Sequence, residues 1–292
     1  MNDHGSSSTT AVIDDGVVQS LRTRRSAGES LGKLAKELGL PWQRLWSMLY
    51  PSPLRSAVAS PSASAARSPV LRPNVSAGSL TEKYRPTSLD TIWGQDAAVK
   101  VLRNFAAAPH PAAFIFEGET GTGKTSAALA LASALGCDLS QKEFGGVYSI
   151  ASGEQSADAV REAYRQMFNS TWYGSGWKAA IVNEADRMSR PAETIWLDVL
   201  EALPPRTVII FTTNEPGRLS QRFLDRCTRL AFESDAAKLR PSATAFAMAV
   251  WKAQTGKRLE PGKIGQIVDA TVADGRLSFR RLVQQLTLEL GI

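Results

Sequence analysis

The feature that most limits the possible folds is a glycine-rich loop at residues 118–125, with the sequence GETGTGKT. It fits the pattern G-x-x-x-x-G-K-[ST], which is typical of loops that hold nucleotide phosphates. The apolar run at 113–116 before it predicts a buried parallel strand. The Ala- and Leu-rich segment 126–135 after it predicts a helix that stops at Gly136. Strand, loop and helix in this order predict an α/β fold that binds a nucleoside triphosphate.

The composition of this phosphate loop indicates how it would hold its ligand. Glycine lets the backbone come close to the phosphates, so that its N–H groups point at them from the positive end of the following helix. Lys124 would reach the β- and γ-phosphates, and the Thr125 hydroxyl would ligate Mg²⁺. The expected nucleotide contacts are Gly118, Glu119, Thr120, Gly121, Thr122, Gly123, Lys124, Thr125 and Ser126.

The charge distribution bears on the partners. The chain has 34 Lys and Arg against 28 Asp and Glu, a net charge of +6, and residues 1–80 hold nine of the basic and five of the acidic residues. This asymmetry favours a segment that meets a polyanion such as DNA, with a merely basic surface as the alternative. Two cysteines without metal spacing, no membrane-length apolar run and no signal-peptide pattern predict a cytoplasmic protein without a membrane partner.

The N-terminal residues predict a small all-α module. Residues 1–12 are expected to be disordered, and residues 13–50 resemble a helix-turn-helix with a turn at Gly39. The last helix would present Gln43 and Arg44 to DNA. A helical module that docks on another protein is the alternative, because few residues on that face are basic.

Residues 51–79 predict a flexible linker. Nineteen of these 29 residues are Pro, Ser or Ala, which leaves too little apolar surface for a core.

Residues 82–95, EKYRPTSLDTIWGQ, carry a resemblance to a known family. Ahead of a phosphate loop, this signature segment resembles that of clamp-loader ATPases such as the small subunits of replication factor C, within the AAA+ superfamily. The resemblance covers residues 80–292 and implies ATP as the nucleotide. It also implies nucleotide contacts by Tyr84, Arg85, Pro86 and Gly94.

The same resemblance sets the expected domains. Residues 80–234 would form the AAA+ core, a parallel sheet flanked by helices, with apolar strands near 113–116, 147–150, 179–182 and 207–212. Residues 235–292 are helical in pattern and would form the lid over the nucleotide. The helical collar that follows in the family has no counterpart before Ile292, so a ring would have to be held together in another way.

A second motif, Asn183-Glu184-Ala185-Asp186, follows the strand at 179–182. It resembles the D-E-A-D form of the Walker B box with the first aspartate replaced by asparagine. Glu184 would activate the attacking water, and Asn183 would contribute to the Mg²⁺ site through a neutral oxygen. Because Asn183 brings no charge to the cation, we expect slow hydrolysis.

Further site residues are implied by the family. Asn214, after the strand at 207–212, matches the first sensor of the γ-phosphate, with a turn-forming Asn as the alternative. Arg280 would be the second sensor, with Arg276 and Arg281 as alternatives.

Arginines are also expected to act between molecules. Arg226, in Leu224-Asp225-Arg226-Cys227, resembles the arginine of the family's S-R-C box and would reach the γ-phosphate of a neighbouring subunit; Arg222 and Arg229 are the alternatives. The helix at 157–167 lies beside DNA in the family, so Arg161 and Arg165 are DNA candidates, although solvated helix charges would look the same.

The leading hypothesis is a clamp-loader-like ATPase that binds and hydrolyses ATP with Mg²⁺ to drive assembly or remodelling on DNA. Its expected partners are DNA, other AAA+ subunits and a sliding clamp. One alternative is an ATP-regulated DNA-targeting factor of a mobile element or replicon. The other is a weakly hydrolysing scaffold subunit, which Asn183 makes credible.

Overall fold

The computed structural model describes residues 69–74, 78–168, 171 and 173–291, together with Leu21, Arg24, Leu34 and residues 36–38. The chain forms two compact units, Met1–Ala63 and Ser64–Ile292. In the first unit, Leu21 and Leu34 are buried and Arg24 pairs with Glu37 at 2.8 Å. Most of the predicted helix-turn-helix, with Gln43 and Arg44, lies outside the described residues and stays a prediction.

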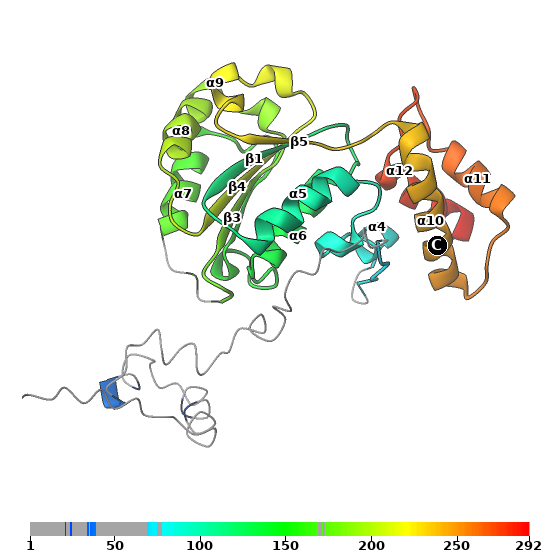
Figure 1. The fold of residues 1–292 in the computed structure, drawn as a ribbon, viewed down its shortest axis with the longest axis horizontal. Helices are drawn as coiled ribbons and strands as arrows, with labels where there is room; N and C mark the ends of the chain where they lie inside the picture. Colours follow the sequence, from blue (N-terminus) through cyan, green and yellow to red (C-terminus); the bar gives the residue numbers. More distant parts are fainter. Residues whose placement is uncertain are drawn as a thin grey trace, which may run out of the picture. The chain divides into compact units, whose positions relative to one another are not determined.

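A five-stranded parallel sheet organises the second unit (Figure 1). The strand order is β2-β3-β4-β1-β5, and the strands are β1 (Ala112–Glu117), β2 (Val147–Ile150), β3 (Lys178–Val182), β4 (Thr207–Thr213) and β5 (Thr228–Ala231). Every residue of β4 is buried because helices cover both faces of the sheet. β1 pairs with β4 and β5, so the phosphate loop starts from the interior of the sheet.

The helices of the core form two layers. Figure 1 shows α5 and α6 on one side of the sheet and α7 and α8 on the other. The bounds are α4 (Leu80–Lys83), η2 (Leu89–Thr91), α5 (Asp96–Ala107), α6 (Lys124–Ala134), η3 (Lys142–Gly145), α7 (Ala157–Phe168), η4 (Ala185–Arg187), α8 (Arg190–Glu201), η5 (Pro216–Arg218) and α9 (Gln221–Leu224).

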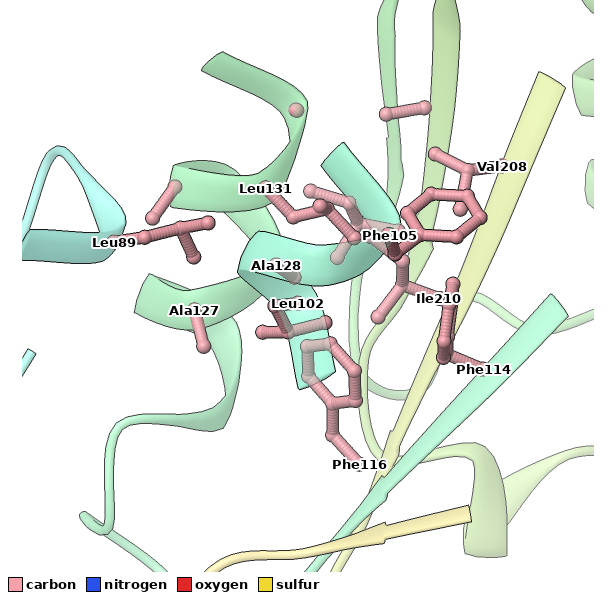
Figure 2. Close-up of a cluster of buried hydrophobic side chains, with 14 of the residues drawn as sticks. Leu89, Leu102, Phe105, Phe114, Phe116, Ala127, Ala128, Leu131, Val208 and Ile210 are labelled. Atoms are coloured by element: carbon pink, nitrogen blue, oxygen red, sulfur yellow. The ribbon is translucent and has the colours of Figure 1, made fainter. Parts of the chain in front are cut away.

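The apolar core on the α5–α6 side fixes the start of α6. Figure 2 shows Leu102 and Phe105 of α5 and Leu131 of α6 packed with strand residues such as Phe114 and Ile210. Small alanines on α6 let this helix lie close to the sheet. The N-terminus of α6, which ends the phosphate loop, is therefore held rigidly at the sheet's carboxyl edge.

The C-terminal helices pack on one another. They are α10 (Ala236–Thr255), α11 (Pro261–Asp269) and α12 (Phe279–Leu290). Asp235 caps α10 and Ser278 caps α12, each accepting a hydrogen bond from a backbone N–H of the first turn. Their apolar faces form a separate core with Leu80 and Tyr84 from the signature segment. The predicted parallel sheet flanked by helices, with a helical C-terminal part, is confirmed.

The end of the predicted linker joins this unit. Val70 N donates to Asp90 O at 3.0 Å, and Asn74 N donates to Lys83 O at 2.6 Å. Leu71 packs against the C-terminal helical core. Among the described helices, none has the length and apolar character that crossing a membrane requires.

Candidate nucleotide site

The phosphate loop leaves β1 and enters α6 in a shape that depends on its glycines. Gly118, Gly121 and Gly123 have φ values of 145°, 82° and 101°, in the region that favours glycine. A Cβ on Gly121 would lie 2.1 Å from Ser278 Oγ, and one on Gly118 would lie 2.6 Å from the Phe232 carbonyl oxygen. The loop is thus pressed between the end of β5 and the first residues of α12.

Lys124 is buried beneath this loop. Its ammonium donates to the carbonyl oxygens of Gly118 at 2.6 Å and Glu119 at 2.8 Å, and to Asn214 Oδ1 at 2.8 Å. Burial and the nearby Arg280 lower the pKa of Lys124 to about 8, although the carboxylates of Asp186 and Glu184 oppose the shift. The positive charge is therefore costly in this protein until an anion, such as a phosphate, comes close.

Asn183 meets Thr125 at the floor of the site. The Thr125 hydroxyl donates to Asn183 Oδ1 at 3.0 Å. On its other side, Asn183 Nδ2 donates to Ser149 Oγ at 3.3 Å and to the Ile150 carbonyl oxygen at 3.4 Å. An aspartate at position 183 would place an acceptor oxygen against the Ile150 carbonyl oxygen, which would repel it. The end of β2 therefore favours an amide donor at this position.

Glu184 is held in an unusual backbone conformation with φ 51°. Its N–H donates to Thr212 Oγ1 at 3.1 Å, and Gln155 Nε2 donates to its carbonyl oxygen at 3.1 Å. Its carboxylate accepts a hydrogen bond from Ser152 Oγ and pairs with Arg187 at 3.2 Å. The sequence interpretation missed Ser152 and Gln155, which follow β2 and have no motif of their own.

Asn214 lies where β4 ends. Besides its contact with Lys124, its backbone N–H donates to Asp186 Oδ1 at 3.2 Å. The Thr213 hydroxyl donates to the same oxygen at 2.7 Å. Asp186 therefore links the end of the N-E-A-D segment to the end of β4.

Two adjoining pockets meet at the phosphate loop. The first is mainly apolar, with lining residues that include Tyr84, Arg85, Pro86, Trp93, Phe246 and Phe279. Trp93 and Phe279 each pack edge-on against Phe246, with ring centroids 5.7 and 5.6 Å apart. The second is polar, and its lining includes Lys124, Thr125, Asn183, Glu184, Asn214 and Arg280. The first suits a base and the second suits phosphates.

Some predicted nucleotide contacts lie outside these two pockets. Gly94 packs against the C-terminal helices, since a Cβ there would lie 2.7 Å from Leu239 Cδ2. Glu119 forms an ion pair with Arg276. Of the three arginines considered for the second sensor, Arg280 is the one that lines both pockets. The loop residues from Thr120 to Ser126 line one or both pockets.

A buried glutamine joins the phosphate loop to the start of the C-terminal helices. Gln95 Nε2 donates to the Thr122 carbonyl oxygen at 3.3 Å and to the Glu233 carbonyl oxygen at 3.0 Å. Its Oε1 accepts from Glu233 N at 2.8 Å. One side chain, 2% exposed, therefore contacts the loop and the segment before α10 together.

Comparison with known proteins agrees with this geometry. Residues 94–236 match the family model for the DNA polymerase III delta subunit. The chain is 31% identical over 159 residues to replication factor C subunit 3 of Saccharomyces cerevisiae, a match covering 52% of this chain and 44% of that protein. It is 30% identical over 203 residues to the replication factor C small subunit of Thermofilum pendens, covering 69% and 60%. The chain therefore resembles replication factor C subunits in sequence.

Solved structures resemble this chain in fold. The Thermotoga maritima RuvB Holliday junction branch migration motor is similar with a TM-score of 0.54 and 18% identity, over 70% of this chain and 64% of that one. The chain spans about half the length of the curated clamp-loader relatives it matches.

The arginine of the D-R-C segment makes contacts within its own chain. Arg226 forms an ion pair with Glu201 on α8, and its Nη1 donates to the Arg222 carbonyl oxygen at 3.0 Å. Arg229 contacts Glu117 at 2.7 Å, while Arg222 is exposed. None of the three lines the two nucleotide pockets described above.

The DNA candidates on α7 are paired within their own helix. Arg161 contacts Asp158 at 2.7 Å and Arg165 contacts Glu162 at 2.8 Å. These exposed pairs reduce the positive field of α7, so the interpretation as DNA contacts stays a prediction.

Proposed function

We propose that this chain is a clamp-loader-like ATPase that uses ATP binding and hydrolysis to drive assembly or remodelling on DNA. The observation that supports it best is the convergence of Lys124, Thr125, Glu184 and Asn214 on one polar pocket beside an apolar one. Arg280 lines both pockets, so the lid can respond to what the loop binds. Apolar packing for a base and donors for phosphates are what an ATP site requires.

The residues present fit Mg²⁺ in the presence of phosphate. The Thr125 hydroxyl and Asn183 Oδ1 lie 3.0 Å apart in the polar pocket, and Mg²⁺ prefers such oxygen ligands. Within the described part of the chain, no group of three His, Cys, Asp or Glu could hold a metal without help. The ion would thus depend on phosphate oxygens, and it would neutralise charge on the phosphates during transfer.

Hydrolysis would require Glu184 to change partners. Its carboxylate must orient or deprotonate water, yet Ser152 and Arg187 now occupy it. Asn214 would hydrogen-bond the γ-phosphate or the water, and Arg226 of a neighbouring subunit would complete the site after leaving Glu201. Partners in this proposal are DNA, further AAA+ subunits and a sliding clamp, a view supported by relatives that are named as replication factor C subunits.

A scaffold subunit that binds ATP but turns it over weakly is the second candidate. The observation that favours it is that Asn183 Nδ2 donates hydrogen bonds to Ser149 and Ile150 at the end of β2. These contacts favour an amide at position 183, and an amide brings no negative charge to a bound Mg²⁺. It differs from the first candidate in turnover, not in binding.

The test measures binding and turnover on the full chain. We expect a fluorescent ATP analogue to bind with magnesium dependence, and Lys124→Ala to weaken binding by about tenfold or more, as for a lost charged contact. Steady-state ATPase is then measured with and without primer–template DNA and a sliding clamp. Stimulated turnover supports the loader, and binding without turnover supports the scaffold. Absence of magnesium-dependent ATP binding would overturn both.

A further inference from the structure

The carboxylate of Asp186 braces the end of β4. Its Oδ1 accepts the Thr213 hydroxyl at 2.7 Å and the Asn214 N–H at 3.2 Å. The Thr213 oxygen in turn accepts Glu215 N at 3.1 Å, and Thr213 is fully buried. Without the carboxylate, a buried hydroxyl donor would lose its partner, which costs more than an ordinary exposed hydrogen bond.

These hydrogen bonds of Asp186 fix the backbone from which the Asn214 side chain extends into the site. Asn214 Oδ1 accepts from Lys124 Nζ, so Nδ2 is left as the donor on a residue that lines the polar pocket. An amide N–H donor suits a terminal phosphate oxygen. A shift of the backbone at Asn214 would move this donor and loosen the contact with Lys124 at the same time.

Asp186 differs from its neighbours in the N-E-A-D segment in its contacts. The adjacent Arg187 pairs with Glu184, across the Walker B turn, at 3.2 Å. Both contacts of Asp186 described above go instead to the backbone and side chain that end β4. The Asp186 carboxylate also raises the pKa of Lys124, although burial and Arg280 lower it by more.

We propose that Asp186 is a positioning residue that lets Asn214 distinguish a nucleoside triphosphate from a diphosphate. The inference rests on the proposed ATP binding and adds a role for a side chain that touches neither nucleotide nor metal. Asp186 acts mainly through the placement of Asn214, so its loss should affect recognition of the terminal phosphate more than recognition of the base or the inner phosphates.

The experiment compares the affinities of the full chain for ADP and for a non-hydrolysable ATP analogue. Asp186→Ala should reduce the preference for the triphosphate by about fivefold, the equivalent of one hydrogen bond, with ADP affinity changed less than about twofold. Asp186→Asn, which keeps an acceptor oxygen, should retain most of the preference. Asp186→Glu keeps the charge but displaces the carboxylate oxygens, so it should also lose the preference for the triphosphate. It provides a second test in case the Ala variant does not fold.

The outcomes separate this inference from the proposed function. Equal weakening of ADP and ATP analogue binding, or an unchanged preference in Asp186→Ala and Asp186→Glu, would show that Asp186 has only a structural role. A wild-type chain that binds both nucleotides alike would also end the inference while leaving nucleotide binding intact. A wild-type chain that binds neither overturns both.

Discussion

At the scale of single residues, Asn183 is the place where this chain departs from the D-E-A-D motif, and the structure shows a local reason for keeping the amide. Its oxygen faces Thr125, and its NH₂ group is held by Ser149 and the Ile150 carbonyl oxygen. A single exchange therefore affects both the metal side and the β2 side of the site.

Asn183→Asp tests both sides. The added charge should raise the ATPase rate and strengthen the Mg²⁺ dependence, while repulsion from the Ile150 carbonyl oxygen should cost about 1–2 kcal/mol of stability. Steady-state turnover against Mg²⁺ concentration and thermal unfolding measure the two effects. Asn183→Leu, without an oxygen, is the control for the metal side. If Asn183→Asp leaves rate and Mg²⁺ dependence unchanged, the inferred weakening by asparagine is wrong.

The lowered pKa of Lys124, about 8, predicts a pH dependence of ATP binding. Bound phosphates favour the charged amine, so below pH 8 the amine is already protonated and affinity is nearly constant. Above pH 8 the free protein loses this proton, and binding must take it up again. ATP affinity should then fall, approaching about tenfold per pH unit. Titrations from pH 7 to 9.5 measure it. Lys124→Arg, always charged, should give a flat profile, and a flat wild-type profile would contradict the assignment.

At the scale of elements, the contact between the phosphate loop and α12 can be tested with two glycines. Gly121→Ala and Gly123→Ala share the strain of a positive φ. Only the Cβ at Gly121 would clash, at 2.1 Å from Ser278 Oγ, because nothing lies within 4 Å of the one at Gly123. Gly121→Ala should therefore destabilise the nucleotide-free protein by about 1–3 kcal/mol more than Gly123→Ala does. Equal unfolding midpoints would show that the loop and α12 are not in firm contact.

The sequence predicted those elements whose pattern is local. β1 to β4 are predictable because each is a short, mainly apolar run in which most residues are buried. β5 was missed, since its sequence TRLA has a single buried residue, and its place at the sheet edge comes from pairing with β1. The pattern indicated only that residues 235–292 are helical, whereas the structure shows that α10 begins at Ala236 and contains Pro241. Capping by Asp235 supports that start, a tertiary and capping effect that periodicity does not reveal.

The site was predictable to a similar extent. Motif residues such as Lys124, Asn183 and Asn214 do line one polar pocket, because the carboxyl ends of parallel strands share one edge. Ser152, Gln155 and the brace by Asp186 could not be predicted, since their contacts depend on how separate loops fold against the Walker B turn.

At the scale of the whole molecule, the position of Arg226 bears on assembly. If it completes a neighbour's site, ATPase activity per chain should rise with protein concentration or with added AAA+ subunits, because the missing charge arrives only in the complex. An arginine finger contributes roughly 10³- to 10⁵-fold in rate. Arg226→Ala should abolish the rise and leave ATP affinity nearly unchanged. Sedimentation and turnover measured over the same concentrations test this.

The exposed Arg222 is the matched control for this prediction. Arg222→Ala should keep the rise, whereas Glu201→Gln, which releases Arg226 from its ion pair, should reach it at lower concentration. If Arg222→Ala abolished the rise and Arg226→Ala did not, Arg222 would be the residue that completes the neighbouring site, and the prediction for Arg226 would be wrong. No rise in either condition would indicate a site that works alone.

The amide of Gln95 has a mechanical consequence. Because one planar amide contacts Thr122 and Glu233 together, the phosphate loop and the segment before α10 cannot separate without breaking one of its hydrogen bonds. If the C-terminal helices move when a nucleotide binds or leaves, we expect this amide to transmit the movement to the phosphate loop. Gln95 would then influence how long a nucleotide stays bound, although it lines neither of the two nucleotide pockets.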